Sequence, residues 1–265
     1  DGNLVNNFNK TIQEYDLGQV ANNKTSLLLN GLVDDTGKAT VNGLGTVNLK
    51  VGANEFTITV TAEDKTTRNY KIKVYRLSNE NKLSSLTITS NPQATMSPAF
   101  QDTFNGTYSY NYDATVTDVT ITATVKDTGK ASVAIYDNAT GATTASLNTK
   151  TETFSIATTD VSVVVTAEDG TVNTYTINLV RSKSADSSLK SLTINHGILT
   201  PVFTQNTRTY TATVDADITE IDVNAVPNSL YGSIKSITGN TNLKFGINQV
   251  EVIVEAEDKT TSSYI

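Results

Sequence analysis

Apolar and polar residues alternate in three segments of this chain that align with one another without a gap. The segments are 51–71, 156–176 and 245–265, and they contain the runs Phe56-Ile58-Val60, Val161-Val163-Val165 and Val250-Val252-Val254. An apolar residue stands five positions before each run: Val51, Ile156 and Phe245. Alternation with a period of two places every second side chain on the same face of a β-strand. Each run therefore predicts a strand with one buried face.

A turn and a second strand follow each run. The triplet Ala-Glu-Asp occurs at 62–64, 167–169 and 256–258, and a tyrosine stands seven residues after each glutamate: Tyr70, Tyr175 and Tyr264. Asp169-Gly170 is a strong signal for a tight turn between antiparallel strands. The residues after Tyr70 and Tyr175 alternate again, up to Arg76 and Arg181. We therefore expect an antiparallel β-hairpin in each segment.

A second shared pattern lies upstream of each hairpin. Three phenylalanines precede a tyrosine by seven or eight residues: Phe8 before Tyr15, Phe100 before Tyr108, and Phe203 before Tyr210. In the last two copies the tyrosine should open a strand, 108–112 or 210–214, and the next strand should begin at Val119 or Ile221. These two copies also begin with Leu-x-x-Leu-x-Ile: Leu83-Leu86-Ile88 and Leu189-Leu192-Ile194. The first copy lacks this opening, and residues 16–23 form an irregular replacement for its second strand.

A complete copy holds about seven short strands in roughly 90–105 residues, which is typical of an immunoglobulin-like sandwich. We predict three domains: 1–78 with its N-terminal strand missing or atypical, 82–182 complete, and 188–265 with its C-terminal strand truncated. The middle copy carries a longer loop near 137–151. The connections 77–82 and 182–188 are short and polar, so neighbouring domains should follow end to end in an extended array.

The composition narrows the classes of partner. Hydrophobic residues make up 37% of the chain, the formal net charge is −7 and the pI is about 4.8. An acidic surface repels phosphate backbones, which argues against nucleic acid. No stretch is long and apolar enough to span a bilayer, and Asp1-Gly2-Asn3 is interpreted as an internal cut or a mature start. The absence of cysteine favours, for a secreted protein, the Gram-positive bacterial exterior.

Several of these motifs resemble the bacterial cadherin-like β-sandwich repeat family. The middle copy carries Ser97-Pro98-Ala99-Phe100 and TAEDGTVNTYTINLVR at 166–181, and the third carries Leu199-Thr200-Pro201-Val202-Phe203. The resemblance covers nearly the whole chain, although the first copy departs from the pattern at its opening. It implies three tandem cadherin-like sandwiches that act as non-catalytic spacers or interaction domains in large secreted or surface-anchored bacterial proteins.

The Glu-Asp pairs are the first candidate ligands, because carboxylate oxygens suit calcium. They are Glu63/Asp64, Glu168/Asp169 and Glu257/Asp258. Each pair falls in a hairpin turn, where aspartate is common for turn chemistry alone, and neither linker carries an acidic cluster. Asp215-Ala216-Asp217 is interpreted as a loop. We therefore predict no metal site and no cofactor.

Aromatic and nucleophilic candidates are equally sparse. The stripe Tyr108-Tyr110-Tyr112 could stack on a sugar ring, but the same positions in the third copy hold Tyr210, Ala212 and Val214, which favours core packing. His196 is the only histidine and follows a predicted strand in a loop. No grouping of nucleophile, base and orienting residue is visible, so we predict no catalytic residues and no enzyme. The triplet Asn-x-Thr, the acceptor pattern for N-glycosylation, occurs at Asn9, Asn23, Asn105 and Asn138. Chance alone predicts such triplets in a chain rich in asparagine and threonine.

The sequence thus predicts a structural or adhesive module of a bacterial extracellular or cell-surface protein, acting as a rod-like spacer or interaction array. Its partners would be other domains of the same protein, cell-wall or host glycans and proteins, or further copies of itself. Two alternatives stay open. One is a set of glycan-binding accessory domains in a secreted enzyme. The other is a subunit of a self-assembling filament or layer that exchanges strands, because incomplete sandwiches leave unpaired strand edges.

Overall fold

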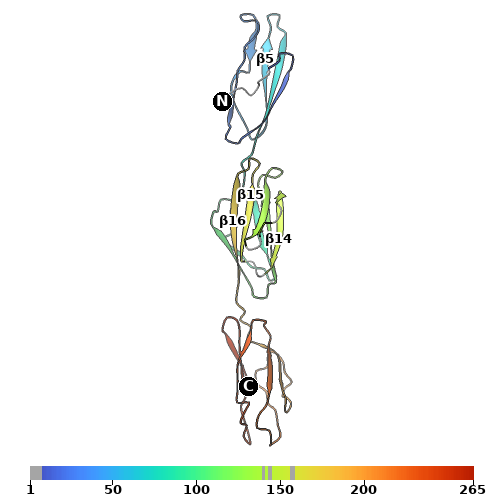
Figure 1. Ribbon diagram of the computed structural model, residues 1–265, viewed down its shortest axis with the longest axis vertical. Coiled ribbons are helices and arrows are strands. Elements are labelled where there is room, and N and C mark those ends of the chain that lie inside the picture. Colours follow the sequence, from blue (N-terminus) through green and yellow to red (C-terminus); the bar gives the residue numbers. More distant parts are fainter. Residues whose placement is uncertain (1–7, 139–140, 143–144, 156–158) are drawn as a thin grey trace. The chain divides into compact units, whose positions relative to one another are not determined.

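The computed structural model describes residues 8–138, 141–142, 145–155 and 159–265 (Figure 1). Every regular element among them is a β-strand, so the predicted all-β class is confirmed. No helix in the described part of the chain could cross a bilayer. Contacts group the chain into two compact units: Asp1–Ile88 with Met96–Ser109 and Thr120–Asn178, and Thr89–Thr95 with Tyr110–Val119 and Leu179–Ile265.

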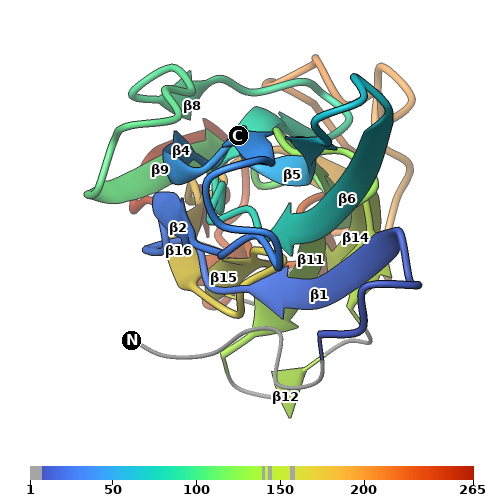
Figure 2. The same cartoon turned by 90° about the horizontal axis from the view of Figure 1, so that it is seen from above.

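The first repeat forms two small sheets. One has the strand order β1-β6-β5-β3 and the other pairs β2 with β4. Strand β1 runs parallel to β6 and beside it (Figure 2), and the other pairs are antiparallel. The strands are β1 (Glu14–Val20), β2 (Ser26–Leu29), β3 (Thr40–Asn42), β4 (Gly45–Asn48), β5 (Gly52–Thr61) and β6 (Thr67–Arg76).

The middle repeat has the fullest sheets. Their orders are β14-β10-β7 and β12-β11-β15-β16-β9-β8, with β13 paired to β11. The strands are β7 (Leu83–Thr89), β8 (Met96–Ser97), β9 (Thr107–Tyr112), β10 (Asp118–Val125), β11 (Ser132–Asp137), β12 (Gly141–Ala142), β13 (Ser146–Leu147), β14 (Thr149–Ser155), β15 (Asp160–Thr166) and β16 (Val172–Arg181).

The third repeat pairs β17 with β18 and forms a second sheet in the order β19-β20-β21. Its strands are β17 (Leu189–Ile194), β18 (Val223–Pro227), β19 (Ser233–Thr238), β20 (Glu251–Glu255) and β21 (Thr261–Tyr264). Residues 77–82 and 182–188, which connect the repeats, contain no regular secondary structure.

The predicted hairpins are confirmed, and we call them the closing hairpins: β5–β6, β15–β16 and β20–β21. All three are antiparallel with the same register, since the central apolar residue of the first strand faces the tyrosine of the second. The aspartate of each Ala-Glu-Asp accepts hydrogen bonds from the backbone N–H and the hydroxyl of the threonine two residues later. This local bond defines the turn.

The residue after each of these aspartates has a left-handed backbone. The φ angles are 72° at Lys65, 86° at Gly170 and 78° at Lys259. A side chain costs free energy in this region because Cβ crowds the neighbouring carbonyl, and only glycine avoids the cost. The middle repeat therefore has the best-suited residue in its turn.

The burial of the alternating runs differs between the repeats. Val161, Val163 and Val165 are fully buried, and the exposed fractions of Val252 and Val254 are 3% and 0%. The corresponding residues of the first repeat, Phe56-Ile58-Val60, are only half-buried. Val51 and Phe245, which precede two of the runs, are exposed, and Ile156 lies outside the described residues. The core is thus complete in the middle repeat and partly open in the first.

Three local predictions need correction. Residues 16–20 of the segment 16–23 belong to the strand β1, which has a bulge between Asp16 and Gln19, and residues 21–23 lie in the turn that follows it. The strand expected at 210–214 does not form. Only a bridge between Thr200 and Thr211 is present, because the partner strand β21 has four residues where β16 has ten. The predicted loop 137–151 contains the short strands β12 and β13 as well as the start of β14.

The hairpin turns give a direct test of the backbone argument. Gly170→Ala should lower the free energy of unfolding by about 1–2 kcal/mol, because no atom lies within reach of the new Cβ and only the left-handed backbone penalises it. Lys65→Gly should raise the stability of the first repeat by roughly 0.5 kcal/mol. Urea unfolding followed by the amide signals of the mutated repeat measures both values.

The matched control is Lys24→Gly, an exposed lysine outside the left-handed region. It should bring no gain, because glycine there only adds freedom to the unfolded chain. Equal losses of stability in Lys24→Gly and Lys65→Gly would contradict the account of the turn.

Candidate functional site

The glutamates of the three Ala-Glu-Asp turns do not share one environment. Glu168 and Glu257 have side chains 19% and 21% exposed, whereas the side chain of Glu63 is 70% exposed. Glu63 makes only a surface ion pair with Lys38, at 3.5 Å. The two sheltered glutamates lie against the polypeptide that connects one repeat to the next.

The turn of the third repeat pairs with its linker in both directions. The Ser184 N–H donates to the Glu257 carboxylate at 3.0 Å, and the Asp258 N–H donates to the Ser184 carbonyl at 3.1 Å. The Thr260 hydroxyl adds a bond to the carbonyl of Ala185, at 3.3 Å. Hydrogen bonds to a charged acceptor are stronger than neutral ones, so the carboxylate is the main anchor of this pairing.

Arg181, the last residue of β16, completes this site. Its guanidinium donates to both carboxylate oxygens of Glu257, with Nη1 at 3.0 Å from Oε2. The guanidinium also lies 4.2 Å from the ring centre of Tyr231, a cation–π geometry that fixes its orientation. Hydrogen bonds from Arg181 and from the Ser184 N–H hold the pKa of Glu257 below its ordinary value, and Glu257 raises the pKa of Arg181.

The turn of the middle repeat uses the same backbone pairing. The Ser78 N–H donates to Glu168 at 2.9 Å, and the Asp169 N–H donates to the Ser78 carbonyl at 3.0 Å. The side chains that contact the carboxylate differ. In place of an arginine, the hydroxyl of Tyr75 donates to Glu168 at 2.8 Å, and the Lys130 ammonium lies 4.0 Å from the carboxylate.

Arg76 stands where Arg181 stands in the next repeat, but it turns away from the glutamate. Its guanidinium donates to the carbonyls of Asn22 and Leu49, at 2.7 and 2.9 Å. The side chain therefore fastens two loops of the first repeat, and the neighbouring Tyr75 donates to the turn glutamate in its place.

We call each such arrangement a linker clamp: the carboxylate of the turn glutamate, the N–H of the next aspartate, and the linker serine that pairs with both. The clamps consist of Glu168, Asp169 and Ser78, and of Glu257, Asp258 and Ser184. The predicted location of the Glu-Asp pairs in hairpin turns is confirmed. The sequence predicts turn chemistry alone for these pairs, and this prediction missed the contact with the linker. The aspartate carboxylates do stay within the turn, whereas the glutamate carboxylates and the aspartate N–H groups bond to the linker serine.

The described residues contain no group of three or more histidine, cysteine, aspartate or glutamate side chains placed to hold a metal ion. The Glu168 and Glu257 carboxylates are instead occupied by donors from the protein itself. Asp215 and Asp217 are exposed in a turn, in agreement with their prediction as a loop.

The tyrosine stripe belongs to the core. Tyr108 and Tyr110 are fully buried and Tyr112 is 2% exposed, which confirms the packing interpretation and excludes these rings from any sugar-stacking face. The Tyr110 hydroxyl contacts the Ser90 hydroxyl at 2.8 Å. In the third repeat the equivalent positions are less covered, since Tyr210 and Val214 are half-buried and Ala212 is exposed. His196 is exposed in a bend after β17.

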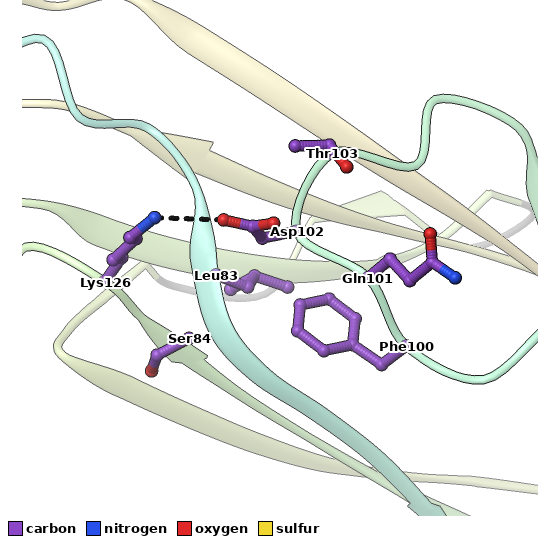
Figure 3. A pocket seen from close by; sticks show the side chains of 7 residues that line it. All are labelled: Leu83, Ser84, Phe100, Gln101, Asp102, Thr103 and Lys126. Carbon is purple, nitrogen blue, oxygen red and sulfur yellow. Dashed lines mark hydrogen bonds and ion pairs between the residues drawn. The ribbon is translucent and has the colours of Figure 1, made fainter.

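A small cavity of about 580 Å³ opens in the middle repeat where β7 begins (Figure 3). Asp102 and Lys126 form an ion pair at 3.0 Å across it, which lowers the pKa of Asp102 and raises that of Lys126. The Asp102 carbonyl accepts the hydroxyl of Tyr175 at 3.2 Å. The ion pair therefore joins the loop after Phe100 to the end of β10, and we assign it a structural role.

Comparisons with known proteins agree on the architecture. The family model described as the cadherin-like beta sandwich domain matches residues 3–77, 83–182 and 189–265. These matches confirm three tandem domains of the predicted class. A search of curated proteins gives no match.

Solved structures of cadherin extracellular domains share only a weak overall likeness with the chain. PcdhgB3 EC1-4 is 10% identical with a TM-score of 0.33, and the match covers 97% of this chain and 73% of that one. Human CDH23 EC21-23 is 11% identical with a TM-score of 0.28, and the match covers 88% and 82%.

The linker clamp can be tested by removing its charge. Glu257→Gln keeps the size of the side chain but loses the charge-assisted bonds, so the Ser184 amide should exchange with solvent severalfold faster. Arg181→Met should act in the same direction because it removes the partner that orients the carboxylate. Hydrogen exchange read by NMR on the full chain measures the effect.

Glu220→Gln is the matched control, since it makes the same chemical change at an exposed glutamate of the same repeat. It should leave the exchange of Ser184 unchanged. Equal exchange rates in Glu257→Gln and the unmodified chain would show that the carboxylate does not hold the linker.

The second clamp should also respond to acid. The folded pKa of Glu257 is depressed, so its stabilising contribution is fully present above the ordinary carboxyl pKa, about 4.3, and is lost as the pH falls through the folded value. The protection factor of the Ser184 amide, corrected for the intrinsic rate, should be constant from pH 7 to about pH 5 and fall below about pH 4. Protection that rises on acidification would contradict the assignment.

Proposed function

Because the chain belongs to the family of cadherin-like beta sandwich domains, we propose that it is a non-catalytic structural or adhesive section of a bacterial extracellular or cell-surface protein. Its repeats act as a spacer, and its linkers are held by protein groups in place of bound calcium. The observation that carries this proposal is the linker clamp, which occurs at both connections between the repeats.

The chemistry of the clamps supports a spacer. A linker of about six polar residues without secondary structure would sample many backbone states, and each ordered residue costs roughly 1–2 kcal/mol of conformational entropy. The clamp restricts that freedom at the linker serine, and in the first linker this residue, Ser78, is only 4% exposed. Restriction of this kind is useful in a module whose task is to keep its neighbours apart.

Composition supports the location. The chain has a net charge of −7 and no cysteine, which fits a soluble surface protein outside a Gram-positive cell that does not depend on disulfides. Its partners in this proposal are further domains of the same protein, with cell-wall or host glycans and proteins as possible contacts of an adhesive surface. The buried tyrosine stripe removes the feature that most favoured glycan binding.

Independence from calcium is the part of the proposal most open to experiment. Since the chain contains no cysteine, the exposed residues Thr57 and Ser233 can be replaced by cysteine and spin-labelled uniquely. The distribution of distances between the labels should be the same in EDTA and in millimolar calcium. It should broaden in Arg181→Met, because the second linker loses its anchor.

Glu220→Gln again serves as the control and should leave the distribution unchanged. A distribution that narrows when calcium is added would show that a metal holds the linkers, and the proposal would then be wrong. A distribution unaffected by Arg181→Met would remove the clamp as its basis.

A further inference from the structure

One side chain at the end of the preceding repeat contacts each linker clamp. Tyr75 stands three residues before the clamp serine Ser78. Arg181 likewise stands three residues before Ser184. Each donates to the turn glutamate of the next repeat, the tyrosine hydroxyl at 2.8 Å and the guanidinium Nη1 at 3.0 Å. We call this place the strand-end position, and the surroundings of the two clamps the first and second junction in chain order.

A second place, in the following repeat, meets each of these side chains. Lys130 is the second residue before β11, and Tyr231 is the second residue before β19. We call this place the turn position. The ammonium of Lys130 lies 5.5 Å from the ring centre of Tyr75, and the guanidinium of Arg181 lies 4.2 Å from the ring centre of Tyr231. Both junctions therefore hold one cation and one aromatic ring, with the two positions exchanged.

The two junctions differ in which repeat supplies the cation. Lys130 belongs to the same repeat as Glu168, and its ammonium lies 4.0 Å from that carboxylate. Lys38, the second residue before β3, pairs in the same way with the turn glutamate of the first repeat, at 3.5 Å. Within the described residues, the ion-pair partner of Glu257 is Arg181, which comes from the preceding repeat. Whichever repeat supplies the cation, its neighbour supplies the ring.

The charges at both junctions are sheltered from solvent. The side chains of Lys130 and Arg181 are 29% and 20% exposed, and a charge that is partly removed from water is costly unless it is paired. Burial alone would lower the pKa of Lys130, but Tyr75 and the charges of Asp127 and Glu168 outweigh burial and raise it. The ammonium therefore keeps its charge at neutral pH. A second cation in the same place would meet repulsion, and a second ring would leave the carboxylate without a cation.

We propose that the strand-end position and the turn position form a pairing site that determines which repeats of this kind can follow one another. A repeat with arginine at its strand-end position takes a follower with an aromatic residue at the turn position. A repeat with tyrosine there takes a follower with lysine. Each matched pair gives one carboxylate, one cation and one ring, whereas a mismatched pair gives two cations or none. Unpaired and like charges of this kind exclude wrong neighbours.

This pairing rests on the proposed function as a spacer, in which protein groups hold the linkers. It adds a rule for the order of the repeats. The four residues of the first junction, Tyr75, Ser78, Lys130 and Glu168, all fall within one of the two compact units of the chain. Those of the second junction, at 181, 184, 231 and 257, all fall within the other. Each pairing site can therefore be tested by itself.

The test exchanges the two residues of the second pairing site in the full chain. Arg181→Tyr leaves two rings and no cation, so the Ser184 amide should exchange with solvent at least about tenfold faster. Tyr231→Lys leaves two cations and no ring, and exchange should be roughly fivefold faster. The double variant recreates the assignment of the first junction and should bring the rate back to within about twofold of the unmodified chain. Hydrogen exchange read by NMR measures all four rates.

Leu230→Lys is the matched control, because it adds the same charge at the neighbouring residue, which is 97% exposed. It should leave the exchange of Ser184 unchanged. Tyr231→Phe keeps the ring and should stay within about twofold of the unmodified rate. The Ser78 amide of the first junction should keep its rate in every variant, and circular dichroism checks that each variant is folded.

The proposal would be overturned by single variants with unchanged exchange, by a double variant whose loss equals the product of the two single losses, or by an equal effect of Leu230→Lys. If Arg181→Tyr alone does not fold, a folded double variant supports the pairing and an unfolded one contradicts it. Glu257→Gln separates the two proposals. Faster exchange in Glu257→Gln without coupling between positions 181 and 231 would remove the pairing and keep the clamp. Unchanged exchange in Glu257→Gln would remove the clamp and the spacer function that rests on it.

Discussion

The carboxylate of a glutamate at the tip of a closing hairpin is the acceptor on which the connection between the repeats depends. It accepts the N–H of a linker serine while the next residue donates back to that serine, so one turn satisfies both backbone groups. Cationic or phenolic donors, Arg181 in one clamp and Tyr75 in the other, complete the coordination of the carboxylate. The carboxylate oxygens are thus satisfied by donors from the protein itself, and charge-assisted bonds of this kind are the stronger ones.

The same hairpin organises the inside of each repeat. In the middle and third repeats its turn contacts the linker, and its tyrosine fastens the first strand, β7 or β17, to the neighbouring loop. Burial raises the pKa of the Tyr175 phenol, so this hydroxyl stays protonated and keeps its donor role at neutral pH. In the first repeat the hydroxyl of Tyr70 makes the bond to the loop, at the carbonyl of Lys10, and the alternating run is half-buried.

The closing hairpins could be predicted from the sequence because their determinants are local. Alternation gives the strands, and aspartate with threonine two residues later gives the turn. The role of Glu168 and Glu257 could not be predicted, since their serine partners lie 90 and 73 residues away. The sequence also gave no sign that Tyr75, and not Arg76, donates to the glutamate of the first clamp. The strand expected at 210–214 does not form because a strand needs a partner of matching length. Residues 16–20, within the segment expected to be irregular, belong to β1 because β6 offers such a partner.

The order of the linker serines tests the central claim most directly. Backbone ¹⁵N relaxation of the full chain in EDTA at neutral pH reports the order parameters of the Ser78 and Ser184 amides. The clamps predict values near those of the flanking strands, about 0.85, in the absence of any metal. Values below about 0.6, typical of flexible backbone, would show that the linkers move freely and would contradict the account.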